Sequence, residues 1–384
     1  MLAIDDHRRL GRELDLFHLQ EDAPGSVFWH PRGLVVLRAL EEHVRRAVAA
    51  DGYEEVRSPQ VLARSVWEKS GHWEKFSAGM MRLDGDAALK PVSCPGHIAL
   101  ARRRSREALP LRLCEMGVVH RKERRSELAR LFRLRQFMQD DGHVFCEEDQ
   151  IDAEVARFWA RARALYQGAG FDVIEASLSL RPEVRAGDDA LWDRAELLLA
   201  RALDAAGIAF DRVPGGGAFY GPKLELMLRD QGGRSWQCGT LQVDLVLPRR
   251  FGIRPPVILH RAMLGSFERF IALLLERHAG KLPPFLAPEA VRVLPVAPEQ
   301  SAYAAEVAAL LERGGARVRV DLRDHDLSRR VSDAHRAKVP IVVVVGPRDV
   351  ASRRVSVREG RELRELDLAA AVDAIAARCR PALS

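Results

Sequence analysis

Cysteine and histidine residues recur in this sequence at a spacing that suits a metal ion. Cys94 and His97 are separated by two residues, and His143 and Cys146 repeat that separation in the opposite order. Thiolate and imidazole groups bind Zn²⁺ at such spacings, and four of them would make a closed structural site. In an extended strand, side chains three positions apart point to opposite faces, which weighs against His143 and Cys146 both being ligands. The spacing indicates a metal and leaves the ligand set open.

Residues 112–146 hold a second pattern, which suits a binding surface. The segments 113–123 and 132–146 alternate polar and apolar residues with a period of two, which predicts two strands, and the short charged link 122–130 predicts a hairpin. Such a polar face could lie in solvent. The acidic, imidazole and thiol groups of residues 140–146 favour instead a floor that binds anions and a metal. One face of the second strand would carry Arg133, Arg135, Phe137, Gln139, Asp141 and His143.

Length and composition set broad limits. With 384 residues, one large or two medium domains are expected. No apolar run long enough to cross a bilayer occurs and residues 1–17 are charged, so we expect neither a membrane span nor secretion. Five scattered cysteines favour a reducing cytoplasm over a disulfide framework. The net charge of +6 permits a polyanionic partner and does not require one.

The elements that must position these residues fall into two domains. Pro59, in a predicted strand, suits an edge strand or an oligomer interface. We expect an α+β domain with an antiparallel sheet over residues 1–280 and a proline-rich linker over 281–290. Strands and helices alternate over residues 291–384, which predicts a small α/β domain with a mostly parallel sheet. In the first domain, helices and strands are predicted at 33–50, 53–61, 98–106, 149–168, 171–180, 188–206, 208–213, 218–228 and 236–247.

Nine segments, taken in order, resemble one protein family. They are similar to the catalytic core and anticodon-binding domain of class II aminoacyl-tRNA synthetases, most closely the threonyl-tRNA synthetases, over nearly the whole chain. The resemblance implies a six- to seven-stranded antiparallel sheet flanked by helices, a homodimer interface around residues 33–61, and a C-terminal α/β anticodon-binding domain. The segments are DHRRLGRELDLF, FWHPRGLVVLRALE, VWEKSGHWEKF, KPVSCPGHIAL, LPLRLCEMGVVHRKE, RQFMQDDGHVFC, GGGAFYGPKLEL, WQCGTLQVDLVLP and HRAMLGSFERF.

The resemblance assigns the hairpin and a later helix to ATP, which would bind with Mg²⁺. Arg121 matches the arginine that binds the α-phosphate. Arg269 matches the arginine that stacks on adenine and reaches the γ-phosphate, and both arginines would be catalytic. Guanidinium groups held there stabilise the charge that develops at phosphorus without a nucleophilic side chain. The other residues assigned to ATP or to the adenylate are Glu123, Arg133, Phe137, Gln237 and Gln242.

The resemblance also selects one zinc site from the alternatives. The three ligands would be Cys94, His143 and His260. Three protein ligands leave coordination positions open, which in the family accept the amino and hydroxyl groups of threonine. Cys146 and His97 would then lie in the core or behind the ligands.

Threonine recognition would follow from that site. Asp141 matches the carboxylate that accepts the threonine hydroxyl. A site built around a hydroxyl can reject valine by roughly 10⁴–10⁵, whereas serine lacks only a methyl group, worth about 1–3 kcal/mol. The chain begins at the catalytic core, without the editing region of bacterial relatives, so we expect appreciable serine activation. The remaining amino-acid contacts are assigned to Gln139, Tyr220, Lys223 and Cys238.

The sequence departs from the family in two further places. The loop over 124–130, usually small and glycine-containing, reads RRSELAR, and the segment 248–256 is shortened. In the family that loop meets ATP and the acceptor end of tRNA, so its change bears on the acceptor. In the second domain, Asp349 and Arg358 fall where anticodon contacts lie, and each could equally be a surface charge. Two other residues there, Arg329 and Arg330, suit phosphate better than bases.

Three functions fit these residues. The first is a homodimeric, zinc-dependent cytoplasmic ligase that forms threonyl-adenylate from L-threonine and Mg-ATP and transfers threonine to the 3′-terminal adenosine of tRNA(Thr). The second is a paralogue that adenylates threonine or another β-hydroxy amino acid and delivers it to a carrier protein or biosynthetic partner. The third, a non-catalytic tRNA-binding protein, is disfavoured by the intact set of ATP and metal residues. The second domain favours tRNA over a carrier protein.

Overall fold

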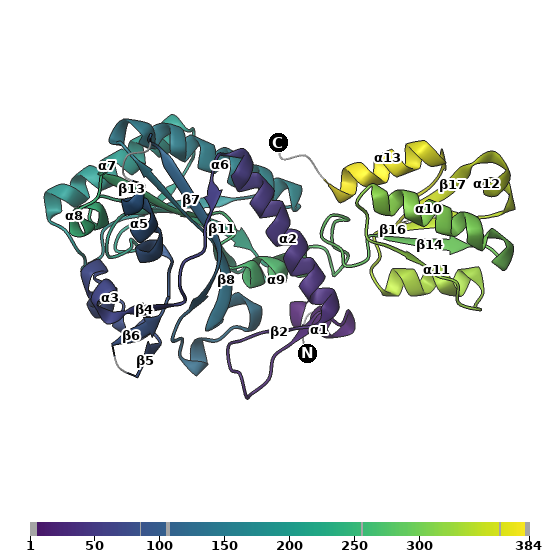
Figure 1. The fold of residues 1–384 in the computed structure, drawn as a ribbon, viewed down its shortest axis with the longest axis horizontal. Coiled ribbons are helices and arrows are strands. Elements are labelled where there is room, and N and C mark those ends of the chain that lie inside the picture. The colour runs from purple at the N-terminus through teal and green to yellow at the C-terminus, as the bar shows by residue number, and fades with distance from the viewer. Residues whose placement is uncertain (1–5, 85, 105–107, 255, 361, 381–384) are drawn as a thin grey trace. The chain divides into compact units, whose positions relative to one another are not determined.

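The computed structural model describes residues 6–84, 86–104, 108–254, 256–360 and 362–380 (Figure 1). The chain divides into two compact units. One comprises residues 1–18, 28–40 and 274–384, and the other comprises residues 19–27 and 41–273. Within the described residues, no helix has the combined length and hydropathy needed to cross a bilayer.

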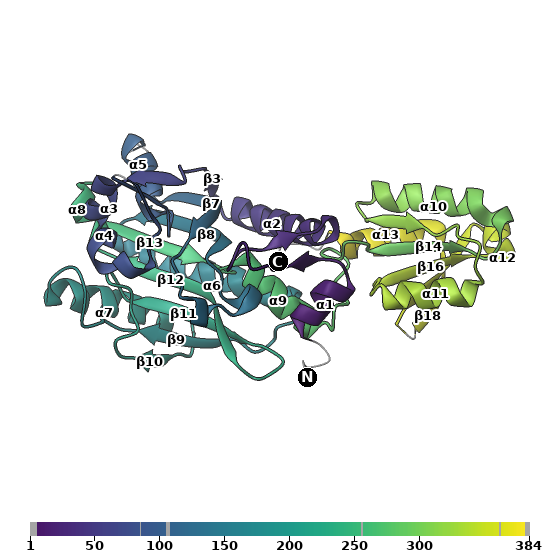
Figure 2. The same ribbon diagram turned by 90° about the horizontal axis from the view of Figure 1, so that it is seen from below.

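An eight-stranded sheet forms the centre of the second unit (Figure 2). Its strand order is β10-β9-β11-β12-β13-β8-β7-β3. All pairs from β9 to β7 are antiparallel, whereas the pair at each edge is parallel. The strands are β3 (Glu54–Glu55), β7 (Leu111–His120), β8 (Gln136–Cys146), β9 (Glu175–Ser179), β10 (Asp211–Val213), β11 (Lys223–Arg229), β12 (Ser235–Asp244) and β13 (Val257–Ala262).

Helices and a small sheet flank these strands. α6 and α7 pack on each other and against β12, and α5 packs against β8. A three-stranded sheet of order β4-β6-β5 lies in the same unit. Bounds are α2 (Pro31–Ala50), β4 (Val61–Ala63), α3 (Arg64–Ser70), α4 (His72–Lys75), β5 (Arg82–Leu83), β6 (Ala87–Leu89), α5 (Cys94–Arg103), α6 (Ile151–Gly168), α7 (Asp189–Ala205), α8 (Leu247–Phe251) and α9 (Phe267–Arg277).

The predicted hairpin is formed by β7 and β8. The two strands pair antiparallel, from His120 opposite Gln136 at the turn end to Leu111 opposite Phe145. From Asp140 onward every residue of β8 is buried, and the strand pairs with β7 along one edge and with β13 along the other. Its polar groups therefore lie inside the unit and not on a solvent-facing surface.

Three details differ from the expectations. The sheet has eight strands where six to seven were expected, because β10 and β3 add a parallel strand at each edge. The strand predicted over 53–61 is interrupted: β3 ends at Glu55 and β4 begins at Val61, and Pro59, which has no N–H to donate, lies between them. The pairing of β7 with β8 stops at His120, so that Arg121 lies just beyond the strand.

The other unit contains a five-stranded sheet of order β15-β14-β16-β17-β18. The pairs β15–β14 and β14–β16 are parallel, whereas the pairs β16–β17 and β17–β18 are antiparallel. The sheet is therefore mixed, and the expected parallel pairing holds for only half of its strand pairs. Apolar residues of α10 and α13 bury one face of the sheet, and those of α11 bury the other. The elements are α1 (His7–Glu13), β1 (Phe17–His18), β2 (Phe28–Trp29), β14 (Val291–Pro295), α10 (Ser301–Arg313), β15 (Val318–Val320), α11 (Leu327–Arg336), β16 (Ile341–Val345), α12 (Pro347–Ser352), β17 (Arg354–Glu359), β18 (Glu362–Asp367) and α13 (Leu368–Cys379).

Candidate active site

A cavity of about 410 Å³ opens over strands β8, β11, β12 and β13. Residues far apart in the sequence meet there, because adjacent antiparallel strands present alternate side chains to the same face. The residues assigned from the sequence that line this cavity are Cys94, Arg121, Gln139, Asp141, Tyr220, Lys223, Gln242 and His260. The assigned residues that do not line it are Glu123, Arg133, Phe137, His143, Gln237, Cys238 and Arg269.

Cys94, His143 and His260 form a buried group, of which Cys94 and His260 line the cavity. Their candidate ligand atoms all lie within 4.8 Å of one another. Cys94 begins α5, and His143 of β8 lies directly opposite His260 of β13 in the sheet. Nε2 of His143 is buried and has no hydrogen-bond partner among the described residues. A thiol, two imidazoles and an unsatisfied ring nitrogen suit a three-ligand zinc site.

The protonation states of this group also suit a cation. Burial, together with the nearby imidazoles of His97 and His260, holds the pKa of His143 well below its usual value, so its ring is neutral and able to ligate. Burial, together with Asp141 and Asp244, raises the pKa of the Cys94 thiol well above its usual value. A metal ion would have to displace the thiol proton as it bound.

Asp244 fixes the orientation of His260. Its Oδ2 is 2.8 Å from Nε2 of His260, and its Oδ1 accepts the N–H groups of Val246 and Leu247. Because Nε2 donates to the carboxylate, Nδ1 of His260 is free to face Cys94, whose Sγ is 3.2 Å away. A carboxylate behind a ligating histidine is a common feature of zinc sites.

The closed four-residue site suggested by spacing alone is not formed. His97 contacts His143 through Nδ1, 2.8 Å from Nδ1 of His143, and it is not among the three residues whose candidate ligand atoms converge. Cys146 is buried, and the charged groups that act on it are those of Glu154, Glu147, Arg112 and Asp149. Opposite parity on β8 therefore separates His143 and Cys146.

The guanidinium group of Arg121 lines the same cavity. Cζ of Arg121 lies 5.1 Å from the centre of the Phe137 ring, and its Nε donates to the carbonyl of Pro91 at 3.2 Å. Burial lowers the pKa of Arg121, and repulsion from Arg269 lowers it further. Carboxylates nearby oppose this decrease in pKa without cancelling it. A bound anion would therefore stabilise the positive charge of the arginines.

The remaining residues assigned to ATP are held by protein partners. Arg133 pairs with Glu123, with Nε 2.9 Å from Oε2. Nη1 of Arg269 donates to the carbonyl oxygen of Gln237 at 2.5 Å. Arg269 therefore reaches Gln237 through the backbone and not through the Gln237 side chain, which takes no part in this contact.

Polar groups without partners also line the cavity. Oε1 of Gln242 and Oγ1 of Thr240 are buried and lack hydrogen-bond partners within the described part of the chain. Asp141 accepts the N–H of Ser93 at 2.9 Å, and Lys223 pairs with Glu225 at 2.9 Å. Buried polar atoms are normally satisfied, so those facing the cavity indicate a polar ligand.

Several contributing residues were given no role from the sequence. Thr240 and Asp244 share the parity of Gln242 on β12. That shared parity was the only feature of the sequence that could have indicated their contribution to the site. His72 also lines the cavity, and its ring meets that of Phe219 edge-on, with centroids 5.0 Å apart. Asp140, by contrast, accepts the N–H groups of residues 263–265 and anchors that loop.

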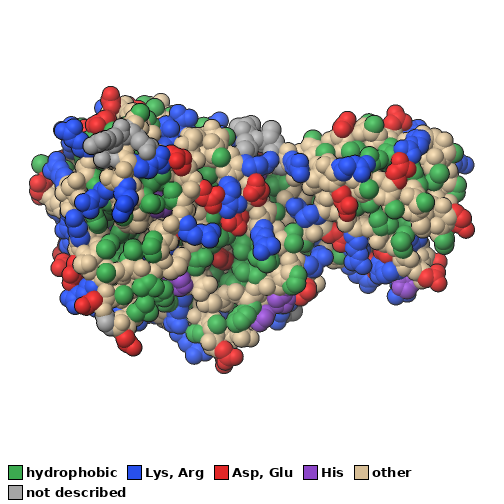
Figure 3. Space-filling view, viewed as in Figure 1, with side chains coloured by type: hydrophobic (Ala, Val, Ile, Leu, Met, Phe, Trp, Pro, Cys, Tyr) green, Lys and Arg blue, Asp and Glu red, His purple; other side chains and the backbone are tan. Residues whose placement is uncertain are grey.

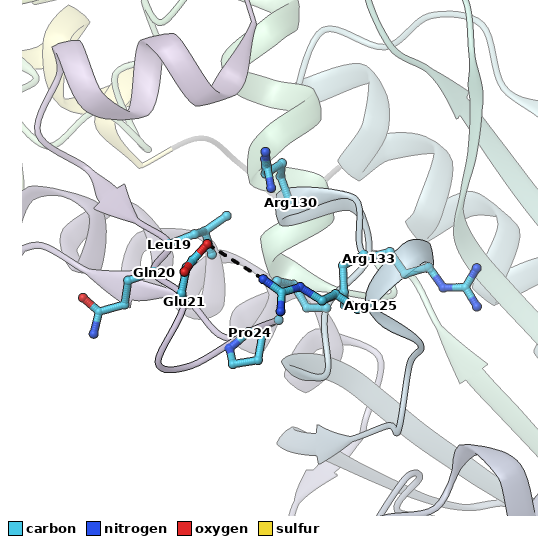
Figure 4. Close-up of a pocket in the computed structure, with 10 residues that line it drawn as sticks. Leu19, Gln20, Glu21, Pro24, Arg125, Arg130 and Arg133 are labelled. Carbon is cyan, nitrogen blue, oxygen red and sulfur yellow. Dashed lines mark ion pairs between the residues drawn. The ribbon is translucent and has the colours of Figure 1, made fainter.

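The loop between β7 and β8 borders a second cavity, of about 250 Å³ (Figure 4). Arg125 lies 3.8 Å from Glu21, and both side chains are exposed. Arg130 adopts a φ of 56°, a left-handed conformation that favours glycine. In Figure 4 the side chains of Arg125, Arg130 and Arg133 extend in different directions and do not converge on one point.

The residues proposed for the anticodon lie in the other unit. Asp349 accepts the N–H of Gly346 at 2.8 Å and so caps α12. Arg358 pairs with Val342 in the β16–β17 ladder. Arg330 is buried and donates to the carbonyl oxygens of Asp321 and His325. The prediction that its side chain could contact phosphate was therefore wrong.

Comparisons with known proteins agree with this architecture. Residues 76–278 match the family described as tRNA synthetase class II core domain (G, H, P, S and T), and residues 290–378 match the family described as anticodon binding domain. The chain is 48% identical over 367 residues to a threonine–tRNA ligase of Cupriavidus necator, covering 92% of this chain and 58% of the relative. A threonine–tRNA ligase of Polynucleobacter necessarius is 46% identical over 367 residues. This chain thus spans little more than half the length of these relatives.

A solved structure extends the likeness to three dimensions. The RNA-binding domain of a threonyl-tRNA synthetase from Cryptosporidium parvum superposes with a TM-score of 0.90 and 34% sequence identity. The match covers 98% of this chain and 99% of that one.

Proposed function

Because the chain belongs to the class II aminoacyl-tRNA synthetases, within the threonyl-tRNA synthetase family, we propose that it is a threonine–tRNA ligase. It would activate L-threonine with Mg-ATP and transfer the threonyl group to the 3′-terminal adenosine of tRNA(Thr). The observation that carries this proposal is one cavity lined by two chemically different kinds of group. Arg121 supplies a cation that can bind an anion, and Cys94 and His260 belong to a group that suits a metal.

The chain's own residues can support adenylation without a covalent enzyme intermediate. The threonine carboxylate attacks the α-phosphorus of ATP, and the bond to pyrophosphate breaks. Arg121 and Arg269 stabilise the negative charge that develops on the phosphoryl oxygens. A ribose hydroxyl of the terminal adenosine then attacks the threonyl carbonyl, and AMP leaves. Glu123 and Phe137 would position adenine, with Arg133, Gln237 and Gln242 around the triphosphate and the adenylate.

We propose Zn²⁺ as the cation held by Cys94, His143 and His260. When bound there, it would act as a Lewis acid towards the amino and hydroxyl groups of threonine. Asp141 lines the cavity, and its Oδ1 lies 4.0 Å from Nδ1 of His143. Its carboxylate would accept a hydrogen bond from the threonine hydroxyl. Gln139, Tyr220 and Lys223 would complete the pocket. Cys238 is buried and does not line the cavity, so it would act from behind the pocket wall.

Two parallel assays test the proposal. Threonine-dependent exchange of pyrophosphate into ATP reports adenylation, and aminoacylation of tRNA reports transfer. Both activities are expected from purified protein supplied with zinc. Exchange without charging would support delivery to a carrier protein, an alternative that the homologues do not favour. Absence of exchange would exclude both catalytic functions.

Serine activation provides a first prediction. A pocket that recognises the hydroxyl accepts serine as well, and the missing methyl group costs only about 1–3 kcal/mol. In pyrophosphate exchange, kcat/KM for threonine should therefore exceed that for serine by less than about 10⁴, whereas valine should be rejected by roughly 10⁴–10⁵. A threonine preference over serine beyond that limit would contradict the recognition mode.

The cavity beside the hairpin loop supports tRNA as the acceptor. Arg125 and Arg130 present separate cations at its rim, which suits successive phosphates of a strand better than one compact anion. The face seen in Figure 3 mixes Lys and Arg with Asp and Glu and has no continuous basic patch. Local arginine groups of this kind would therefore matter for a nucleic-acid partner.

A second prediction concerns this loop. The variant Arg125→Ala/Arg130→Ala should raise KM for tRNA. It should also make the plot of log K for tRNA binding against log salt concentration less steep, by about one unit of slope for each lost phosphate contact. Threonine-dependent exchange should change far less, because neither side chain lines the larger cavity. The control is Arg194→Ala, which removes an exposed arginine paired with Glu148. Equal losses in charging and exchange would exclude a specific role for the loop in acceptor binding.

The remaining features of the proposal concern organisation. We propose a catalytic domain over residues 1–280, a linker over 281–290 and an anticodon-binding domain over 291–384, with Asp349 and Arg358 near the anticodon. We also propose a cytoplasmic homodimer. The short strand β3 lies at one edge of the eight-stranded sheet, which leaves an edge where a second copy could pair.

A further inference from the structure

A buried chain of polar side chains runs behind the proposed zinc site. Nδ1 of His143 is 2.8 Å from Nδ1 of His97, and Nε2 of His97 is 3.3 Å from Oε2 of Glu115. Nζ of Lys90 is 2.7 Å from Oε1 of Glu115. Ser58 donates to Glu115 through both its hydroxyl, at 2.7 Å, and its backbone N–H, at 3.2 Å. All five residues are buried, and Lys90 and His97 have 0% exposure.

The direction of each hydrogen bond follows from the group at the far end. Burial alone would raise the pKa of Glu115, but hydrogen bonds from His97, Lys90 and Ser58 lower it to about 2, so its carboxylate only accepts. Nε2 of His97 must then carry the proton that it donates to Glu115. In a neutral imidazole the other nitrogen accepts, so Nδ1 of His97 accepts from Nδ1–H of His143. The proton on Nδ1 leaves the lone pair of His143 on Nε2.

Nε2 of His143 is the ring nitrogen that lacks a partner among the described residues. His143 belongs to the group whose ligand atoms converge with those of Cys94 and His260. If the tautomers of His97 and His143 were both reversed, Nε2 of His143 would carry a proton and could not ligate. The carboxylate of Glu115 excludes that arrangement, although two hydrogen bonds separate it from His143.

The local structure is built to bring this chain together. A Cβ atom on Gly96 would lie 2.5 Å from Cβ of Ser58, so glycine is required for α5 to approach the segment that carries Ser58. An ion pair buried as deeply as Lys90 and Glu115 carries a large desolvation cost and is weak evidence for a contribution to stability. Its placement directly behind a metal-binding group favours a role in orientation.

We propose that Lys90, Glu115 and His97 are positioning residues that lock the tautomer of His143 and thereby set the affinity of the site for zinc. This inference rests on the proposed zinc site, and it adds residues that do not touch the metal or threonine.

The test is zinc affinity, measured by competition with a chelator on the whole folded chain, with the absorption spectrum of the Co²⁺-substituted protein as a second readout. Glu115→Gln keeps the shape of the side chain but can donate to His97, which permits the reversed tautomers. It should weaken zinc binding by about 10- to 100-fold, the range typical of partners behind metal ligands. The matched control is Glu154→Gln, a buried carboxylate paired with Arg112, which should leave zinc affinity unchanged.

A pair of substitutions at His97 separates orientation from packing. In His97→Asn the side-chain oxygen can replace Nδ1 as the acceptor for His143, whereas the longer side chain of His97→Gln places its amide nearer the position of Nε2. Zinc should bind His97→Asn about 10-fold more tightly than His97→Gln. A purely structural role predicts the reverse order, because glutamine fills more of the space left by histidine.

The outcomes are distinguishable from failure of the proposed function. If the parent chain binds zinc and activates threonine but folded Glu115→Gln binds zinc within twofold of the parent, the inference is overturned and the function stands. If Glu115→Gln does not fold, the order of the two His97 variants decides. If the parent binds no zinc, the proposed metal site and this inference fall together.

Discussion

Replacement of Cys94 by serine is expected to weaken zinc binding by more than about 100-fold, since loss even of a partner behind a ligand costs 10- to 100-fold. The same change should reduce the preference for threonine over valine from roughly 10⁴–10⁵ to about 10², the discrimination that a pocket without hydroxyl recognition achieves. The physical reason is that Sγ of Cys94 lies 3.2 Å from Nδ1 of His260 in a group that offers three ligand atoms. Zinc content after dialysis and amino-acid-dependent pyrophosphate exchange measure the two effects.

Cys146→Ser is the matched control for this prediction. Its thiol is equally buried and lies three residues after His143, but it is surrounded by Arg112 and Glu154 rather than by the zinc group. It should retain zinc and the preference for threonine. Loss of zinc from Cys146→Ser and not from Cys94→Ser would refute the three-ligand site.

Arg121→Lys is the second change with a large expected effect. Lysine keeps the positive charge but loses the planar fork and the stacking on Phe137. The kcat for threonine-dependent exchange should fall by about 10²–10³, as is typical when one group that stabilises developing charge is removed. KM for threonine should change much less, because Arg121 would act on the phosphoryl group. Steady-state exchange at varied ATP and threonine separates these terms.

A partly buried arginine outside the cavity controls for the loss of packing. Arg112 lies on β7, the strand that precedes Arg121, and makes a bidentate pair with Glu154, at 2.9 and 2.5 Å. Arg112→Lys removes a comparable fork without touching the cavity, so exchange by the folded variant should stay close to the parent value. Similar losses in both variants would mean that Arg121 acts through stability and not on the reaction.

The hairpin was the part of the fold most accessible from the sequence. Its two strands alternate with a period of two, and a short charged link joins them, so β7 and β8 could be placed from local pattern alone. The alternation of strands and helices in the C-terminal domain could be predicted from local pattern in the same way. β18 has little local signal, because Glu362–Asp367 is a mostly exposed edge strand with few apolar residues to set a period. α12 has little signal as well, because it is a single short helix after Gly346.

The site depends on pairings between distant strands, which no local pattern supplies. His143 faces His260 because β8 and β13 are neighbours, although more than a hundred residues separate them in the sequence. The choice between Cys146 and His260 as a ligand therefore came from family resemblance and not from spacing. Nothing in the sequence indicated the roles of Asp244 and Glu115 beyond their parity in predicted strands, because the histidines that they contact lie on other elements.

The left-handed backbone conformation of Arg130 affects the stability of the fold. An L-residue in the left-handed region costs about 1–2 kcal/mol, because its Cβ approaches the following carbonyl oxygen. Folded domains are stable by only about 5–15 kcal/mol, so this one side chain can take up a tenth or more of the whole margin. Glycine at the same position would avoid the cost. The chain thus sacrifices stability to keep a guanidinium at the rim of the loop cavity, and the scope for further destabilising changes elsewhere is reduced accordingly.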